Sequence, residues 1–230
     1  MVNQQAYQAI AEVLKQKEVQ IVAVSKFKTV EDIAALYSLG QRDFGENYVQ
    51  ELLEKQAYFA SQAQYQDIRW HFIGHLQRNK VKYLAPFIYM IHSVDSFKLL
   101  QEINKQAAQH NRTIACLLQI HIAEETTKFG LTSNEAIDLL SFYEAQKADI
   151  GNIQVHGIMG MATFTEDVAV LTKEFQELKA LFSMLQTRFF LEPNSLFKEI
   201  SMGMSNDYEL AIENGSTMVR IGSLFFGNRS

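Results

Sequence analysis

Short apolar runs alternate with amphipathic stretches along this chain, and that alternation limits the possible folds more than any other feature. The apolar runs span residues 20–25, 43–44, 70–73, 88–92, 114–122, 154–159, 198–201 and 218–221. Between them, segments 29–39, 95–109 and 165–186 carry apolar residues three and four positions apart, which is the spacing of one helix face. Further helices are expected at 4–17, before the first run, and at 208–215.

Strands that alternate with helices run parallel and are joined by right-handed crossovers. Eight such units in 230 residues fit an α/β fold with a closed (β/α)8 TIM barrel. No Pro- or Ser-rich linker divides the chain, so we expect one barrel domain over residues 1–230, with an extra N-terminal helix. An open doubly wound sheet is the alternative, but it would need a Gly-rich turn where this chain has SKFKT (25–29).

Composition and charge argue against several classes of protein. The net charge is −5, and no basic run is present, so we expect no nucleic-acid partner. The N-terminus lacks a basic-then-apolar signal pattern, and no apolar run approaches the length of a membrane span, which predicts a cytoplasmic protein. Cys116 is the single cysteine and lies among apolar residues, so we expect it in the core. No exposed apolar stripe is evident, which favours a monomer.

The loop after the seventh predicted strand has the features of a phosphate site. TIM barrels bind substrates at the carboxyl ends of their strands and often hold phosphate in the loops after strands seven and eight. The loop after strand seven begins 201-SMGMSND-207 and offers Gly203 with the hydroxyls of Ser201 and Ser205. Ser205 or Asn206 is expected to cap the following helix, whose first N–H groups would then be free for an anion.

The loop after the eighth strand adds a second set of contacts. In 220-RIGS-223, Gly222 lets a ligand approach the backbone, and Ser223 supplies a hydroxyl. Each loop alone is better explained by ordinary capping and a tight turn than by a ligand site. Their joint occurrence at the two expected barrel positions favours a site for one phosphate monoester.

Lys26 stands at the end of the first predicted strand. Barrel closure places strand one beside strand eight, so Lys26, Arg220 and the two loops should converge. A lysine amine partly withdrawn from water has a lowered pKa and can form a Schiff base with an aldehyde. The expected ligand is therefore a phosphorylated aldehyde. Pyridoxal 5′-phosphate (PLP) is the commonest such cofactor, but phosphosugar aldolases use similar geometry, so spacing alone leaves both open.

Several longer motifs identify a resemblance that runs through the whole chain. They are AVSK (23–26), FGENYVQE (44–51), WHFIGHLQRNK (70–80), HSVD (92–95), EETTKFG (124–130), HGIMGM (156–161), SMGMSND (201–207) and GSTMVRIGSLFFGNR (215–229). In these motifs and their order the chain resembles the YggS/PROSC family, the pyridoxal phosphate homeostasis proteins. The resemblance implies a TIM barrel of the alanine-racemase N-terminal-domain type. It also implies a role in intracellular PLP balance without an established reaction. Because an imine forms reversibly, transfer of PLP to a lysine of a PLP-requiring apo-enzyme is chemically reasonable.

The resemblance also assigns the phosphate end of the site. PLP would be held as an aldimine of Lys26. Its phosphate would be bound by Ser205 and by the backbone at Gly222 and Ser223, with Ser201 as a further contact.

The other end of the cofactor would face Arg220 and Asn47. By resemblance Arg220 lies opposite the pyridine nitrogen, and Asn47 lies beside the ring. Because a guanidinium stays charged, it disfavours protonation of that nitrogen and weakens the ring as an electron sink. Alanine racemases share this arginine but add a second domain and a catalytic tyrosine, whereas this sequence ends just past the eighth predicted strand. We therefore expect a PLP-holding protein with no catalytic residue; a PLP-dependent racemase-like enzyme is the alternative.

Histidines on or just after strands three to six raise the possibility of a metal site. They are His71, His92, His121 and His156. A His-x-His pair and carboxylates at matching strand ends are missing, so we expect no metal. His121 also departs from the family, where asparagine is common, and His75 stands where the family often has proline.

Two other lysines are alternatives to Lys26. Lys28 lies two residues further into the loop and is expected to be solvated. Lys128, in TTKFG, is balanced between a surface charge and a second, transient contact to the aldehyde.

Overall fold

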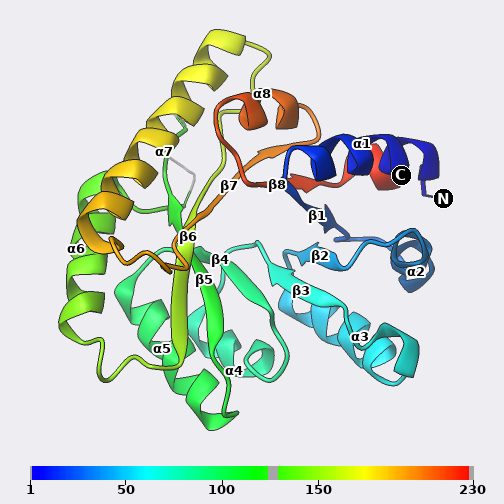
Figure 1. The fold of residues 1–230 in the computed structure, drawn as a ribbon. Helices are drawn as coiled ribbons and strands as arrows, with labels where there is room; N and C mark the ends of the chain where they lie inside the picture. Colours follow the sequence, from blue (N-terminus) through cyan, green and yellow to red (C-terminus); the bar gives the residue numbers. More distant parts are fainter. Residues whose placement is uncertain (1, 124–128, 228–230) are drawn as a thin grey trace.

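The computed structural model describes residues 2–123 and 129–227 and contains a closed barrel of parallel strands. Each strand pairs with the next in sequence, and β8 pairs with β1 to close the barrel (Figure 1). The strands are β1 Gln20–Val24, β2 Asp43–Glu46, β3 Arg69–Phe72, β4 Met90–Val94, β5 Ile114–Ile120, β6 Ile153–Gly160, β7 Glu199–Met204 and β8 Met218–Ile221. The predicted closed barrel is confirmed.

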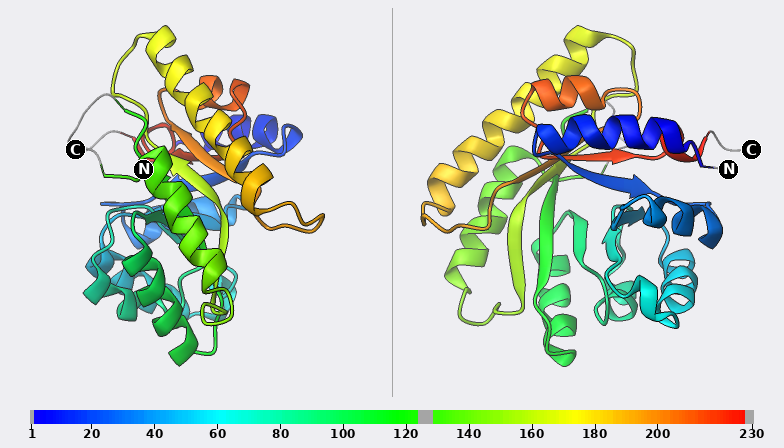
Figure 2. Two further views of the ribbon diagram at one scale, coloured as in Figure 1. Left: turned by 90° about the vertical axis from the view of Figure 1, so that its left-hand side faces the viewer. Right: turned by 45° about the vertical axis from the view of Figure 1, so that its right-hand side comes forward.

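Helices cover the outside of the barrel, as the views in Figure 2 show. They are α1 Gln4–Gln16, α2 Val30–Ser38, α3 Val49–Ala60, α4 Val81–Leu84, α5 Phe97–Gln109, α6 Ser133–Ala145, α7 Val168–Phe189, α8 Tyr208–Glu213 and α9 Ser223–Phe226, with short 3-10 turns at Ala63–Tyr65 and Arg78–Lys80. The sequence pattern identified neither α3 nor α6. The latter begins with a capping box between Thr132 and Glu135, which is a readable start signal. Helix α5 is capped by Ser96 and not by Asp95 as expected.

The extra N-terminal helix α1 packs against α9, which follows the last strand (Figure 1). The N–H of Asn3, the N-cap of α1, donates to the carbonyl oxygen of Phe225 at 2.7 Å. The rings of Tyr7 and Phe225 meet edge to face with centroids 5.3 Å apart. These contacts join the start of the described chain to the segment that follows β8.

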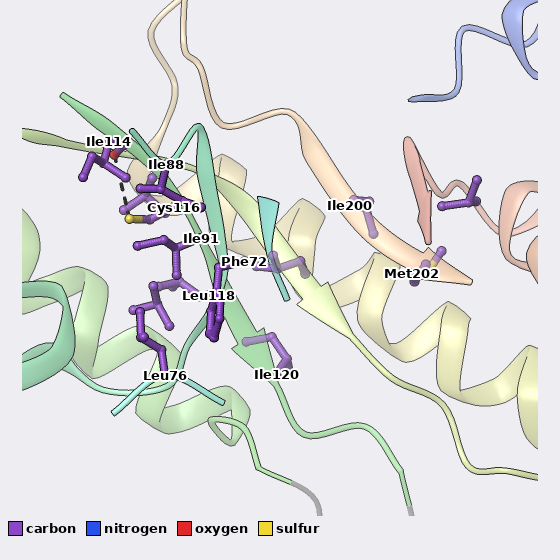
Figure 3. Close-up of a cluster of buried hydrophobic side chains, with 14 of the residues drawn as sticks. Phe72, Leu76, Ile88, Ile91, Ile114, Cys116, Leu118, Ile120, Ile200 and Met202 are labelled. Atoms are coloured by element: carbon purple, nitrogen blue, oxygen red, sulfur yellow. Dashed lines mark hydrogen bonds between the residues drawn. The ribbon is translucent and has the colours of Figure 1, made fainter. Parts of the chain in front are cut away.

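Two apolar layers follow from the alternation of side chains along each strand. The outer layer lies between the strands and the helices; Figure 3 shows part of it, including Cys116, which is fully buried as predicted. Burial raises the pKa of the Cys116 thiol, so the thiol stays protonated. The inner layer is smaller and consists of Val22, Met90, Leu117, Met159 and Met218. Buried polar side chains on the strands, among them His71, His92, Ser201 and Arg220, lie in the barrel as well.

Strand β7 differs from its predicted bounds in a way that matters for the site. It was expected to end at Ser201, but it runs to Met204. Its pairing with β8 shifts between Ser201 and Met204, and Gly203 has φ +91°. This irregularity places Ser201 inside the strand and leaves the loop to begin at Ser205. For β5 the predicted strand, 114–122, was too long. The strand ends at Ile120, so His121 follows it.

Gly157 in the HGIMGM motif leaves no room for a side chain between β6 and β7. Its φ is +156°, and a Cβ atom there would lie 1.8 Å from the carbonyl oxygen of Glu199. We expect Gly157→Ala to lower the free energy of unfolding by about 3 kcal/mol, measured by urea denaturation. Gly151→Ala is the control, because nothing lies within 4 Å of its added Cβ. Equal stability of the two variants would contradict this packing.

Candidate functional site

A cavity of about 460 Å³ lies at the carboxyl ends of the barrel strands. That volume is within the usual range for small-ligand sites. Its lining comes from residues at or after β1, β2, β3, β6, β7 and β8: Val24, Lys26, Asn47, Ile73, Met161, Thr163, Phe164, Thr165, Met204, Ser205, Asn206, Asp207, Arg220, Gly222 and Ser223. Every predicted cofactor contact except Ser201 is in this set.

The turn that carries Lys26 is held from both sides. The hydroxyl of Ser25 donates to Glu46 Oε1 at 2.6 Å, and the carbonyl oxygen of Ser25 accepts from Lys55 Nζ at 2.7 Å. After Lys26, the N–H of Phe27 donates to Glu51 Oε1 at 2.5 Å. Phe27 has φ +62°, a conformation that costs a non-glycine residue free energy. The flanking hydrogen bonds stabilise this turn and so fix the backbone position from which the Lys26 side chain extends.

The groups that hold this turn form a buried ion cluster between β2 and α3. Lys55 Nζ lies 2.8 Å from Glu46 Oε1 and 2.6 Å from Glu51 Oε1, and the side chain of Lys55 is only 6% exposed. Burial raises the pKa of Glu46, and the charge and hydrogen bond of Lys55 oppose this only in part. One amine therefore neutralises carboxylates on either side of the Lys26 turn. Glu46 carries a structural role here.

Lys28 does not line the cavity. Its Nζ donates to the carbonyl oxygens of Phe226 and Gly227, at 3.0 and 3.4 Å, at the end of α9. Lys26 is thus the lysine that lines the cavity among the described residues. Lys128 lies outside the described residues.

The loops after β7 and β8 are joined directly by Ser205. Its hydroxyl oxygen accepts a hydrogen bond from the N–H of Gly222 at 3.2 Å. The next N–H groups, those of Ser223 and Leu224, begin α9 and have no acceptor among the described residues, as is usual in a first helical turn. Two hydroxyls and two free N–H groups therefore gather at this side of the cavity, which suits a phosphate.

The expected cap of α8 is wrong. Neither Ser205 nor Asn206 caps the helix; the N-cap is Asp207, and it makes no side-chain capping bond. The Asp207 carboxylate instead accepts from the N–H of Met204 at 2.5 Å and closes the turn after β7. Burial raises the pKa of Asp207, while this hydrogen bond and the charge of Arg220 oppose the rise.

Arg220 is 4% exposed and is fixed by three hydrogen bonds to β6 and β7. Its Nη1 donates to the carbonyl and the hydroxyl oxygens of Ser201, both at 2.7 Å, and its Nη2 donates to the carbonyl oxygen of Gly160 at 2.9 Å. Burial lowers the pKa of Arg220 to about 10, and the charge of Asp207 works against this shift. Arg220 is therefore still charged near neutral pH. Ser201 is fully buried and holds Arg220, outside the cavity lining.

Asn47 contributes a buried side-chain oxygen without a hydrogen-bond partner among the described residues. It follows β2 and lines the cavity, and its Oδ1 is buried with no hydrogen-bond partner among the described residues. Gly74 packs closely behind it, since a Cβ there would lie 2.3 Å from the carbonyl oxygen of Asn47. A buried unpaired amide oxygen is costly and is typical of a ligand site. Together the amine, guanidinium, amide and phosphate-binding groups fit a small phosphorylated aldehyde such as PLP.

Several lining residues were missed by the sequence patterns. Residues from the loop after β6 complete the cavity, namely Met161, Thr163, Phe164 and Thr165, together with Met204 at the end of β7 and Asn206 and Asp207 after it. Only barrel closure brings the β6 loop to this position, and no local motif signals it. Lys55 was missed because α3 was missed: Glu51 and Lys55 are four positions apart on that helix and form an ion pair.

The four histidines considered as metal ligands lie in different surroundings. No group of three or more His, Cys, Asp or Glu side chains within residues 2–123 and 129–227 is arranged to hold a metal ion. His71 and His92 are buried inside the barrel, whereas His75 stacks on Phe129 with ring centroids 4.2 Å apart. His121 follows β5 and does not line the cavity.

Comparisons with known proteins give a consistent result. The profile of the family described as "Alanine racemase, N-terminal domain" matches residues 3–230. A protein named "Pyridoxal phosphate homeostasis protein" from Pasteurella multocida is 38% identical over 92% of this chain and 87% of its own length. One of the same name from Homo sapiens is 37% identical over 99% of this chain and 84% of its own length. The structure of PipY from Synechococcus elongatus with PLP bound has a TM-score of 0.82 and 31% identity, and the match covers 96% of this chain and all of that one (100%).

The ion cluster beneath the Lys26 turn can be tested by stability. Lys55→Met keeps the length of the side chain but leaves Glu46 and Glu51 without their buried counter-charge. We expect a loss of about 3–5 kcal/mol in the free energy of unfolding at neutral pH. Lys147→Met is the matched control, because Lys147 pairs with Glu144 at 3.4 Å on the surface, where its side chain is 66% exposed. It should change stability by less than about 1 kcal/mol; similar losses in both would argue against the cluster.

Proposed function

The chain belongs to the pyridoxal phosphate homeostasis proteins, and we propose that it binds PLP at Lys26 and helps to keep the cofactor available in the cell. One observation carries the proposal. Residues picked from the sequence as cofactor contacts, spread from Lys26 to Ser223, line a single cavity whose donors suit a phosphorylated aldehyde.

Each part of the cavity has a separate task in this proposal. PLP supplies an aldehyde that condenses reversibly with a primary amine, and Lys26 provides that amine. The hydroxyls of Ser205 and Ser223 and the free N–H groups at the start of α9 bind the phosphate. Arg220, charged and fixed by its bonds to Ser201 and Gly160, faces the pyridine nitrogen and keeps a proton away from it.

We propose that the protein holds the cofactor and does not turn over a substrate. A racemase needs a second acid–base group opposite the lysine. Among the described residues, the cavity lining includes no Tyr, His or Cys, and its carboxylate, Asp207, is already bonded to the N–H of Met204. A racemase-like activity remains the alternative, because the family profile bears the name of alanine racemase.

Release of the cofactor follows the same chemistry in this proposal. Because condensation of an aldehyde with an amine is reversible, the lysine of a PLP-requiring apo-enzyme can take the cofactor from Lys26. None of the helices in the described part of the chain combines the length and apolarity needed to span a bilayer. A cytoplasmic location, and a monomeric state that leaves the cavity accessible, belong to the proposal.

The visible spectrum tests PLP binding. The purified protein, or the protein after addition of PLP, should be yellow, and borohydride reduction should attach the cofactor permanently to the peptide that carries Lys26. Lys26→Ala should lose both the absorption band and the attachment. Lys28→Ala is the matched control and should keep both, because Lys28 bonds to the end of α9. A wild-type protein that stays colourless with PLP would overturn the proposal.

Deuterium exchange separates the holder from the racemase-like enzyme. The PLP-loaded protein is incubated with a panel of amino acids that carry deuterium at the α carbon. We expect no loss of the label above the background set by free PLP. Robust loss that disappears in Lys26→Ala would favour the enzyme.

A further inference from the structure

A chain of hydrogen bonds runs through the barrel interior from Arg220 to the opposite wall. Ser201 Oγ lies 2.7 Å from Arg220 Nη1 and 3.1 Å from His92 Nδ1. His92 Nε2 lies 2.9 Å from His71 Nδ1, and His71 Nε2 lies 2.9 Å from Asp43 Oδ1. These residues stand on β8, β7, β4, β3 and β2, and Arg220 is the one that lines the cavity.

The series of hydrogen bonds ends, opposite Arg220, at the carboxylate of Asp43, which is held in place. Arg69, at the first position of β3, donates from Nε and Nη2 to the two oxygens of Asp43, at 2.7 and 2.6 Å. Burial works against the charged form of Asp43, but the hydrogen bonds from His71 and Arg69 outweigh it, so the pKa of Asp43 lies below its ordinary value. The Arg69 side chain is 44% exposed, so this end of the hydrogen-bond series reaches the protein surface.

The two ends determine the direction of every bond between them. A guanidinium can only donate, and an ionised carboxylate can only accept. A neutral histidine has one donor and one acceptor nitrogen. If Asp43 accepts from Nε2–H of His71, then Nδ1 of His71 accepts from Nε2–H of His92. Nδ1 of His92 is then an acceptor for the hydroxyl of Ser201, whose oxygen accepts from Arg220.

The opposite direction fails at Ser201. If His71 carried both protons, His92 would have to donate from Nδ1 to Ser201. The Ser201 oxygen would then receive donors from both His92 and Arg220, and its own proton would have no acceptor among the described residues. Ser201 is fully buried, so an unpaired hydroxyl proton there is costly. Burial, aided by the charge of Arg220, also holds the pKa of His92 well below its usual value, so His92 stays neutral.

We propose that Arg220, Ser201, His92, His71 and Asp43 form one directional hydrogen-bond relay that positions Arg220 and couples the inner end of the cavity to the Asp43–Arg69 pair. Its link to the cofactor rests on the proposed function, in which Arg220 faces the ring nitrogen. The direction of the bonds does not depend on that function. His92, His71 and Asp43 are positioning residues, since none of them lines the cavity.

The direction can be measured without any cofactor. In the full-length protein with ¹⁵N-labelled histidine, two-bond nitrogen–proton spectra at neutral pH report which ring nitrogens carry protons. We expect His71 and His92 both to be neutral with the proton on Nε2. A proton on Nδ1 of His92, or a doubly protonated His71, would overturn the relay. If the protein fails to bind PLP, the proposed function fails while this measurement still decides the direction.

The coupling is tested with PLP bound. His71→Gln can still reach Asp43 through its side-chain amide but offers His92 no ring acceptor. We expect it to shift the absorption maximum of the bound cofactor and the pH dependence of that band, although residue 71 does not line the cavity. Ser93→Ala is the control, because Ser93 is buried beside His92 and its hydroxyl has no partner among the described residues. It should leave the band unchanged.

A structural role alone would give a different result. It would lower the melting temperature of His71→Gln and leave the cofactor band in place, and that outcome would overturn the coupling. Asp43→Asn provides a second variant should His71→Gln fold poorly. It keeps an oxygen acceptor for His71 but removes the charge that sets the direction, and it should shift the band in the same way. An unchanged band in a folded Asp43→Asn protein would equally contradict the proposal.

Discussion

The closure of β8 on β1 is the interaction on which the rest of the site depends. The ladder pairs Gln20 with Met218 and Val22 with Arg220, so the two strands run side by side up to the cavity. A Cβ atom on Gly222 would lie 3.2 Å from the carbonyl oxygen of Val24, which shows how closely the backbones continue past the paired residues. Because the ladder is in this register, Lys26 emerges next to the loop that begins at Gly222. Residues from opposite ends of the sequence then line one cavity.

Closure also leaves an interior that is unusually polar for a barrel core. Its apolar part is small, with Met90, Leu117 and Met159 among its members, and charged or polar side chains fill much of the remainder. Burying charge is costly unless each group is paired, and here the pairing is organised at both ends of the cavity. The Lys55 cluster supports the Lys26 turn, and hydrogen bonds to β6 and β7 support Arg220. In both places the burial of charge costs free energy of folding but fixes the geometry, as is common at functional sites.

The sequence patterns predicted the barrel and six of the fifteen residues that line the cavity, and they failed where strands carry polar residues. The alternation of apolar and amphipathic segments located the strands. The motifs shared with the family indicated Lys26, Asn47 and the last two loops. Strand β2 was predicted as only 43–44, yet all four of its residues, Asp43–Glu46, are buried. A prediction based on hydrophobicity alone assigns a glutamate such as Glu46 to a loop, even where it lies in a strand. Ser201 was predicted as the last residue of its strand and the first of the following loop, whereas the strand continues to Met204. Its true position inside β7 follows from a bulge that no local signal announces.

The changed position of Ser201 alters the view of how the site is held. As a phosphate contact it would have been one hydroxyl among several at the cavity wall. Inside β7 it is bonded to Arg220 through both its hydroxyl and its carbonyl oxygen, so the guanidinium cannot rotate without breaking two bonds. A third bond, to Gly160, fixes the remaining direction. An arginine held in this way keeps its charge at one place whether or not a ligand is bound. The cavity therefore has a preformed cationic end, and the backbone turn that carries Lys26 is also held in place, so binding of a cofactor needs little ordering of either.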